Sequence, residues 1–111
     1  MQVQITGKNL KIGQALPQYI TGELKALVKK YFKDAANARV VVEKNGSKFK
    51  AEIQVKVNGY VGGIISSAEA DDAYSAFGDA LIHAAKRMRR KKRQFIDKHR
   101  AHHYEKDIEM V

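Results

Sequence analysis

The chain has no cysteine and no tryptophan, and only one proline among its 111 residues. The absence of cysteine excludes disulfide bridges, thiolate catalysis and cysteine-ligated metal sites. No run of 18 apolar residues occurs, and the first five residues alternate between polar and apolar, so neither a membrane-spanning helix nor a secretory signal peptide is expected. With 44% hydrophobic residues the chain can bury the core of one domain, and we expect a soluble, cytoplasmic protein.

The chain has positive charge in excess, and that charge is concentrated. The formal net charge is +9, from 21 Lys and Arg against 12 Asp and Glu. Residues 86–100 contain nine cations and one anion, whereas residues 1–85 contain 11 cations and eight anions. Such dense charge repels itself, and an anionic polymer or surface is the usual partner that offsets the repulsion. Nucleic acid is therefore the favoured partner, and an anionic membrane is the second.

Apolar periodicity predicts a strand, a helix, three strands and a second helix. Alternating and β-branched residues indicate the strands, most clearly from Phe49 to Val57, and apolar residues three and four apart indicate the helices. The predicted strands cover residues 2–6, 38–43, 49–57 and 60–66, and the helices cover residues 14–33 and, from a start between 67 and 72, up to about 99. This order predicts an α+β fold in which both helices lie on one face of a four-stranded sheet.

Turn and cap residues set several of the predicted boundaries. Asn45-Gly46 and Asn58-Gly59 predict hairpins between the last three strands. Gly62-Gly63 predicts a bulge or a close backbone approach in the fourth strand. Ser66 and Glu69 have the spacing of a capping box at the start of the second helix.

The cations of the second helix predict that it extends beyond the sheet. With Met88 at the centre of the buried stripe, 100° per residue puts Lys91 and Lys92 within about 60° of the buried direction. Burying two unpaired ammonium groups against an apolar sheet is too costly, so the helix should have left the sheet by residue 91. We expect the remainder to form a cationic rod that can follow a phosphate backbone.

The first helix carries a second row of cations. Lys25, Lys29 and Lys33 are spaced by four and lie opposite the predicted buried stripe, a pattern that is also common in ordinary solvent-exposed lysines. If the two helices pack side by side, this row and the cationic rod would flank a groove for a phosphate backbone, with Lys8 in the loop near one end. Most of the nine aromatic residues, Tyr74 among them, fall on predicted buried stripes, which favours recognition of RNA shape and backbone over base stacking.

Two other interpretations are less consistent with the sequence. The histidines and acidic residues of 99–107 have spacings that could hold a metal ion, but a charged C-terminal tail is usually frayed, and no catalytic constellation occurs elsewhere. We therefore expect no enzyme activity, no metal or other cofactor and no small-molecule substrate. A basic amphipathic helix can also bind anionic lipid, but only Phe95 and Ile96 follow Met88 as bulky apolar residues, so no membrane partner is expected.

Three motifs occur in a specific order: Ile5-Thr6-Gly7-Lys8-Asn9-Leu10, the strand from Phe49 to Val57, and Asp72-Ala73-Tyr74-Ser75-Ala76-Phe77 at the start of a helix that ends in a basic run. Over about residues 1–100 this set resembles the family of ribosome hibernation-promoting factors and ribosome-associated inhibitors. The resemblance implies a βαβββα fold similar to a double-stranded-RNA-binding domain. It also implies binding to the small ribosomal subunit near the decoding channel during stationary phase or stress, where the protein excludes mRNA and tRNA.

Carried over to this chain, the resemblance implies that small-subunit rRNA is contacted by the basic end of the second helix, with a contribution from the first helix. The implied RNA-binding residues are Lys86, Arg87, Arg89, Arg90, Lys91, Lys92, Arg93, Lys25 and Lys29. Pro17 and Glu23 depart from the pattern, because many members have a basic residue at these positions.

We expect residues 1–100 to form the ribosome-binding domain and residues 101–111 to form a flexible C-terminal tail. These last residues contain neither the acidic tail of some short family members nor the linker of the long ones. The chain is thus either a short form or the N-terminal part of a long form, whose further domain would pair ribosomes into dimers. Composition and geometry alone also fit a general structured-RNA-binding module or a ribosome-assembly factor.

Overall fold

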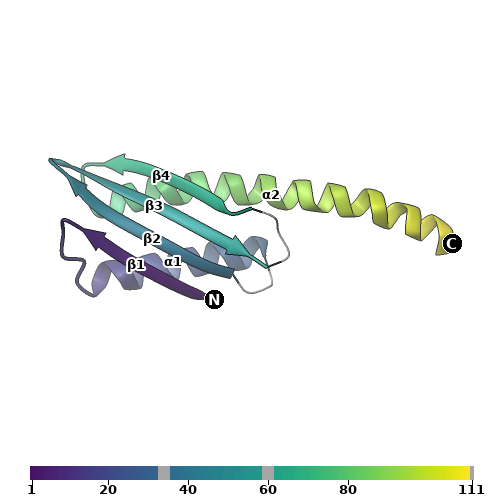
Figure 1. Cartoon of the computed structure of the whole chain (residues 1–111), viewed down its shortest axis with the longest axis horizontal. Coiled ribbons are helices and arrows are strands. Elements are labelled where there is room, and N and C mark those ends of the chain that lie inside the picture. Colours follow the sequence, from purple (N-terminus) through teal and green to yellow (C-terminus); the bar gives the residue numbers. More distant parts are fainter. Residues whose placement is uncertain (33–35, 59–61, 111) are drawn as a thin grey trace.

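The computed structural model describes residues 1–32, 36–58 and 62–110, with the backbone alone described from residue 94 onward. The elements are β1 (Gln2–Lys8), α1 (Ala15–Tyr31), β2 (Ala36–Asn45), β3 (Lys48–Val57), β4 (Ile64–Ala70) and α2 (Ala73–Met110). Their order confirms the predicted α+β fold with βαβββα connectivity (Figure 1).

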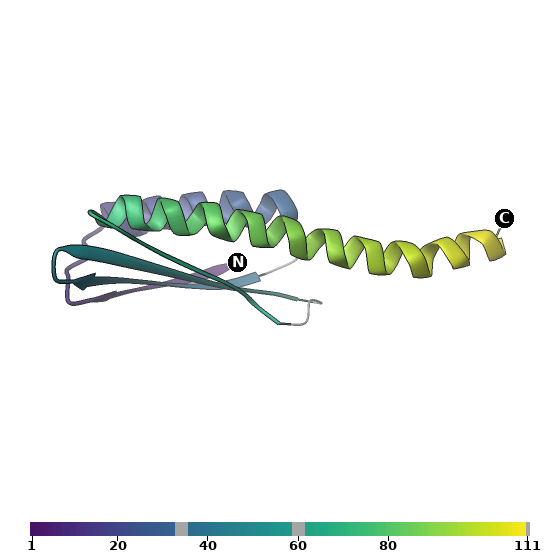
Figure 2. The ribbon, with the colours of Figure 1, turned by 90° about the horizontal axis from the view of Figure 1, so that it is seen from above.

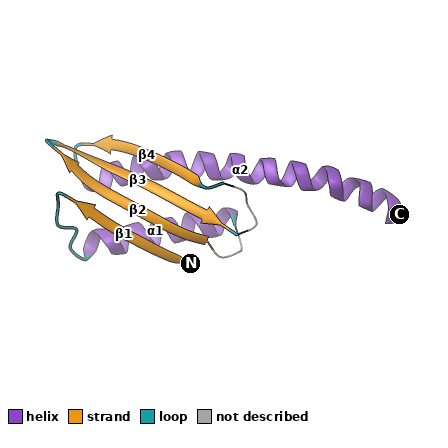
Figure 3. Ribbon diagram, viewed as in Figure 1, coloured by secondary structure: helices purple, strands orange, loops and turns teal. Residues whose placement is uncertain are grey.

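The four strands form one sheet in the order β1-β2-β3-β4. β1 pairs in parallel with β2, whereas β2 with β3 and β3 with β4 are antiparallel. A parallel pair needs a crossover connection, and α1 provides it. Figure 2 shows both helices on one face of the sheet, where α2 packs on β3 and β4 and lies beside α1. The opposite face, which we call the open face, carries no helix, as Figure 3 also shows.

The hydrophobic core lies between the sheet and the helices. On β2 and β3 every second side chain is buried, and on α1 the buried side chains recur every four residues. α2 contributes Phe77 and Met88, both fully buried, together with three buried alanines that let the helix approach the sheet closely. The one buried polar side chain among the described residues, Ser66, donates its hydroxyl to the carbonyl oxygen of Ala80 at 2.9 Å. β4 and α2 are thereby joined by a satisfied polar contact.

The hairpin between β2 and β3 is confirmed, with a shift of one residue in its turn. Asn45 is still paired with Lys48, so the two turn residues are Gly46 and Ser47. Gly46 has φ of 59°, a left-handed conformation that glycine adopts without steric cost. The second predicted turn includes Gly59, which lies outside the described residues.

The predicted position of β4 is wrong by four residues at each end. The strand runs from Ile64 to Ala70, and its pairing extends to Phe49 opposite Ala70. Its serines, alanines and glutamate have low strand propensity, but pairing with β3 and packing under α2 override that preference. The capping-box prediction is therefore also wrong, because Ser66 and Glu69 both lie within β4.

The two glycines predicted within β4 lie before it. A Cβ atom added to Gly63 would lie 3.3 Å from the carbonyl oxygen of Val55, so the predicted close backbone approach is confirmed, but in the segment that leads into the strand. At the other end of the chain, α2 continues to Met110, whereas the sequence predicted an end near residue 99. The division into a domain of residues 1–100 and a flexible tail of residues 101–111 stays a prediction.

Candidate nucleic-acid interface

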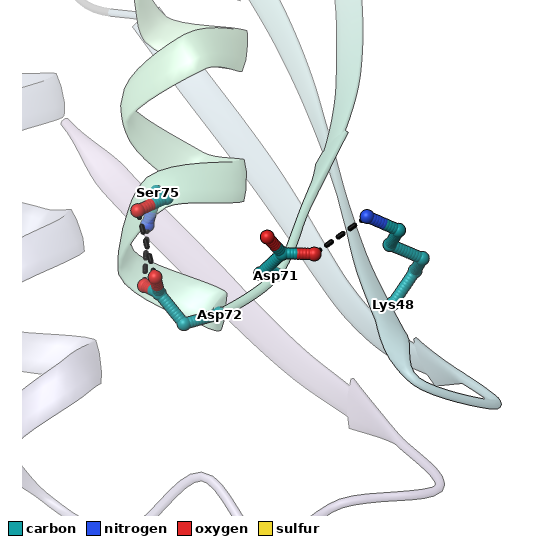
Figure 4. A network of polar contacts seen from close by, with 4 residues as sticks. All are labelled: Lys48, Asp71, Asp72 and Ser75. Carbon is teal, nitrogen blue, oxygen red and sulfur yellow. Dashed lines mark hydrogen bonds and ion pairs between the residues drawn. The ribbon is translucent and has the colours of Figure 1, made fainter.

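The start of α2 is fixed by two acidic residues (Figure 4). Asp72 accepts hydrogen bonds from the backbone N–H and the hydroxyl of Ser75, both at 2.8 Å, and these bonds lower the pKa of its carboxyl group. Asp71 pairs with Lys48 of β3, and this pairing raises the pKa of the lysine. Negative charge at a helix N-terminus interacts favourably with the helix dipole, so both carboxylates stabilise the start of α2. The cap fixes where α2 starts over the sheet and hence which of its residues reach beyond it.

The cationic segment, which we define as residues 86–93, begins where the buried stripe of α2 ends. Met88 is fully buried and is the last buried side chain among those described. The other seven side chains of the segment are cations. Five are exposed and two are half-buried: the exposed ones are Lys86, Arg87, Arg89, Arg90 and Arg93, and the half-buried ones are Lys91 and Lys92.

No carboxylate among the described residues forms an ion pair with any of these seven cations. Figures 1 and 2 show that α2 continues well past the edge of the sheet, as the sequence predicts. At 1.5 Å per residue a helix of 38 residues is roughly 57 Å long, and the longest extent of the molecule is 61 Å. The cations thus lie on a projecting helix and have no carboxylate partner among the described residues, an arrangement that suits an extended anion.

Lys91 marks the point at which α2 leaves the body of the domain. A Cβ atom added to Gly62 would lie 3.3 Å from the Lys91 Nζ atom, so the ammonium group lies beside the loop before β4. The half-buried Lys91 side chain therefore reaches the backbone that leads into β4. This contact agrees with the expectation that the helix leaves the sheet by residue 91.

The lysines of α1 are not arranged as the sequence suggested. Tyr19 marks the side of α1 that faces α2, because its ring centroid lies 5.3 Å from that of Tyr74. At 100° per residue, Lys25 points roughly 120° away from Tyr19 and Lys29 roughly 80° away. Both side chains are exposed, and at these angles they point more toward solvent than toward α2. Lys33 lies outside the described residues, and Lys8 is the last residue of β1, on the open face, instead of lying in the loop after it.

Lys30 is a further cation of α1, and the sequence patterns did not indicate it. This exposed residue points within roughly 20° of Tyr19, toward α2, and its Nζ atom lies 5.5 Å from the ring centroid of Tyr31. The spacing of four that links Lys25, Lys29 and Lys33 does not include Lys30. Lys30 is identified only when helical angles are measured from the side of α1 that packs against α2, and not from the side that packs on the sheet.

Two aromatic side chains are more accessible than the sequence suggested. Tyr74 was assigned to the buried stripe but is 46% exposed, and Tyr19 is 41% exposed. Their rings are tilted by 56° to one another. The ring centroid of Tyr19 also lies 5.9 Å from that of the buried Phe77, in an edge-to-face arrangement. Because this pair lies on the first turns of α1 and α2, it is at the opposite end of the helix layer from the cationic segment.

The described residues contain no group of three or more metal-ligating side chains. The metal candidate of residues 99–107 lies where side chains are not described. Within the described part of the chain, no helix is long and apolar enough to cross a membrane.

Fold and surface together define a small α+β domain with a covered sheet and a projecting cationic helix. The sequence profile of the family described as Sigma 54 modulation protein / S30EA ribosomal protein matches residues 3–95. The chain belongs to this family.

Named relatives agree with this assignment. The chain is 34% identical over 100 residues to the ribosome hibernation promotion factor of Rhizobium meliloti, a match that covers 89% of this chain and 52% of that protein. It is 32% identical over 99 residues to the ribosome hibernation promoting factor of Escherichia coli, covering 89% of this chain and all of that protein. The chain thus spans about half the length of its rhizobial relatives and the full length of the shorter one.

Solved structures show the same fold. The N-terminal domain of Thermus thermophilus Protein Y superposes with a TM-score of 0.73 at 31% identity, covering 81% of this chain and 98% of that domain. A ribosomal subunit interface protein from Coxiella burnetii superposes with a TM-score of 0.71 at 22% identity, covering 83% of this chain and 98% of its own. The second likeness concerns the fold alone.

Proposed function

We propose that this protein is a ribosome-associated translation inhibitor that acts in the cytoplasm. It binds the small ribosomal subunit near the decoding channel during stationary phase or stress, and there it excludes mRNA and tRNA. Family membership and the names of the relatives support a role in ribosome hibernation. The cationic segment of α2 is the observation that carries the proposal at the level of individual residues.

Binding to rRNA needs phosphate neutralisation more than a base code. The cationic segment supplies seven cations over about two helical turns without any carboxylate partner among the described residues. We assign the RNA-binding role to Lys86, Arg87, Arg89, Arg90, Lys91, Lys92 and Arg93. Lys25 and Lys29 belong to the proposed interface only where rRNA also reaches the outer side of α1, because they point away from α2.

The proposal is tested by charge reversal of three exposed arginines. In the variant Arg89→Glu, Arg90→Glu and Arg93→Glu, co-sedimentation with purified small subunits should be lost, because three phosphate contacts are replaced by repulsion. The half-buried Lys92 is left unchanged so that packing is not disturbed. Inhibition of translation in a cell extract should be lost in parallel.

A matched control reverses three exposed lysines at the other end of the domain. Lys8, Lys11 and Lys44 lie on or beside the ends of β1 and β2, away from the cationic segment. Their replacement by glutamate changes the net charge equally and should leave most of the binding intact. Equal binding by both variants, with circular dichroism spectra unchanged, would remove the cationic segment from the interface.

Excess double-stranded RNA distinguishes this function from that of a general structured-RNA-binding module. Stoichiometric binding that resists the competitor and blocks translation supports hibernation. Binding that is lost equally to any duplex would contradict it.

A further inference from the structure

The open face of the sheet has an ordered pattern of side chains. Strand register places most of its outward residues in four rows that cross the strands, and the pair Asn45 and Lys48 at the β2–β3 hairpin lies beyond the fourth row. The first row, at the end of the sheet where β1 begins, contains Gln2, Asn37 and Lys56, and the second contains Gln4, Arg39, Gln54 and Ile65. The third row contains Thr6, Val41, Glu52 and Ser67. The fourth row, at the end of β1, contains Lys8, Glu43, Lys50 and Glu69. The two halves of this face differ in charge.

In the first two rows the only charged side chains are cations. Arg39 and Lys56 are exposed and accompany four amide side chains around an open hollow of about 340 Å³. No carboxylate lines this hollow. In the fourth row, by contrast, lysine and glutamate alternate across all four strands, so each lysine has an acidic cross-strand neighbour. Within these four rows, cations without a directly paired acidic neighbour are therefore confined to the first two, where Arg39 also borders an adjoining hollow lined by Glu43 and Glu52.

The first two rows lie at the end of the sheet from which α2 projects (Figure 1). Lys91 of the cationic segment lies beside Gly62, and the next residue, Gly63, approaches the carbonyl oxygen of Val55. Val55 is the neighbour of both Gln54 and Lys56 on β3. The amide-lined hollow and the cationic segment are thus at one end of the molecule, on opposite sides of the sheet.

We propose that this hollow is a second RNA site, which takes a nucleotide segment separate from the one that lies along α2. Arg39 and Lys56 would bind phosphate, and the amides would pair with base edges or ribose hydroxyls, because an amide offers both a donor and an acceptor. Gln54 already donates from its Nε2 atom to the Glu52 carboxylate at 3.0 Å, so this bond orients its amide. The domain would then be held between two RNA segments.

The inference rests on the proposed function, because it presupposes that the bound partner contains RNA. It extends that function by giving the domain two RNA-facing sides. An acidic protein segment would also match the two cations, but its carboxylate side chains only accept hydrogen bonds, so they would leave the oxygens of the four amides unused. RNA, which presents phosphates and base edges in alternation, uses both.

The first test measures the salt dependence of binding to small subunits for two double variants. Arg39→Gln with Lys56→Gln removes two cations from the hollow, and Lys8→Gln with Lys50→Gln removes two from the fourth row. Two lost phosphate contacts should reduce the slope of log K against log salt by roughly 1.4 to 1.8, equivalent to roughly 25- to 60-fold weaker binding near 0.1 M salt. The fourth-row variant has the same net charge and should retain the wild-type slope.

The second test identifies the partner directly. The chain contains no cysteine, so Gln54→Cys or Lys50→Cys carries a single photoreactive probe. Both residues are half-buried positions of β3 on the same face, four residues apart. We expect rRNA crosslinks from residue 54 and none from residue 50, at nucleotides distinct from those reached by Arg90→Cys on α2.

Equal slopes for the two double variants while the wild type binds would overturn this inference and leave the proposed function standing. Crosslinks from residue 54 to a ribosomal protein only would overturn it as well. Failure of the wild type to bind small subunits would overturn both.

Discussion

The two parts of α2 differ in what surrounds them, although they belong to one continuous helix. From Ala73 to Ala85 the helix lies over the sheet, and Phe77 is fully enclosed. From Lys86 to Arg93 the only enclosed side chain is Met88. An isolated helix of a few turns is marginal in water, and a run of like charges weakens it further. The packed part thus supplies the stability that keeps the charged part helical, and the charged part can specialise for binding.

The largest expected effect is a difference in unfolding free energy between a variant in the packed part of α2 and a variant in the charged part. Phe77→Ala should lower the free energy of unfolding by about 3–5 kcal/mol, because it leaves a cavity between α2 and the sheet. Arg90→Ala should change it by less than about 0.5 kcal/mol, because that side chain is exposed. Urea unfolding followed by circular dichroism measures both values. Similar losses for the two variants would mean that the charged part contributes to the core after all.

A smaller effect is expected where β4 meets the packed part. Ser66→Ala removes the buried hydroxyl that donates to Ala80, which should cost about 1 kcal/mol of unfolding free energy. Ser67→Ala is the matched control, because the Ser67 hydroxyl is exposed on the open face and makes no hydrogen bond among the described residues; the Nδ1 atom of His83 lies 3.2 Å from the backbone carbonyl oxygen of Ser67, which the substitution keeps. If Ser67→Ala destabilised the protein as much as Ser66→Ala does, the polar contact would not be the cause.

The cap of α2 should make a pH-dependent contribution that is smaller again. The pKa of Asp72 is lowered in the folded state by its bonds to Ser75, from an ordinary value of 3.8. Its stabilising effect is therefore complete well above pH 3.8 and is lost as the pH falls through the lower, folded-state pKa. Asp72→Asn keeps a cap without this titration. Melting temperatures from pH 2 to pH 6 should show a gap between wild type and variant that closes at the acidic end, and a constant gap would contradict the assignment.

The smallest expected effect is the dependence of the melting temperature of the free protein on salt concentration. Screening reduces repulsion within the cationic segment, so raising the salt from 0.05 to 0.3 M should raise the melting temperature by roughly one or two degrees. The variant Arg89→Gln, Arg90→Gln and Arg93→Gln should show a smaller rise. An equal rise in both proteins would locate the salt effect elsewhere.

Patterning on the scale of one element predicted the fold well. Period-2 alternation located β3 within one residue, and the spacing of apolar residues located α1. β4 was misplaced because the run from Tyr60 to Ser66 has more β-branched and aromatic residues than the segment from Ile64 to Ala70. The strand was decided by its partner, since β3 pairs with it from Phe49 to Val55.

The candidate site was predicted in part. The cationic segment follows from local charge density and helical angle, so the sequence could place it on a projecting helix. The direction of the α1 lysines could not be deduced in the same way, because it depends on which side of α1 faces α2. The contact between Tyr19 and Tyr74 sets that side, and it favours Lys30 over Lys25.

Charge density, helical period and strand alternation are properties of neighbouring residues, and for this reason the amino-acid sequence by itself determined the order of elements, the layered architecture and the cationic end of α2. Register across strands and the relative rotation of two helices join residues far apart in the chain. The four rows of the open face, the amide-lined hollow and the contact of Lys91 with the loop before β4 arise from such pairings. Only the tertiary structure decided them, because a shift of one residue in register would turn every side chain of a strand to the other face.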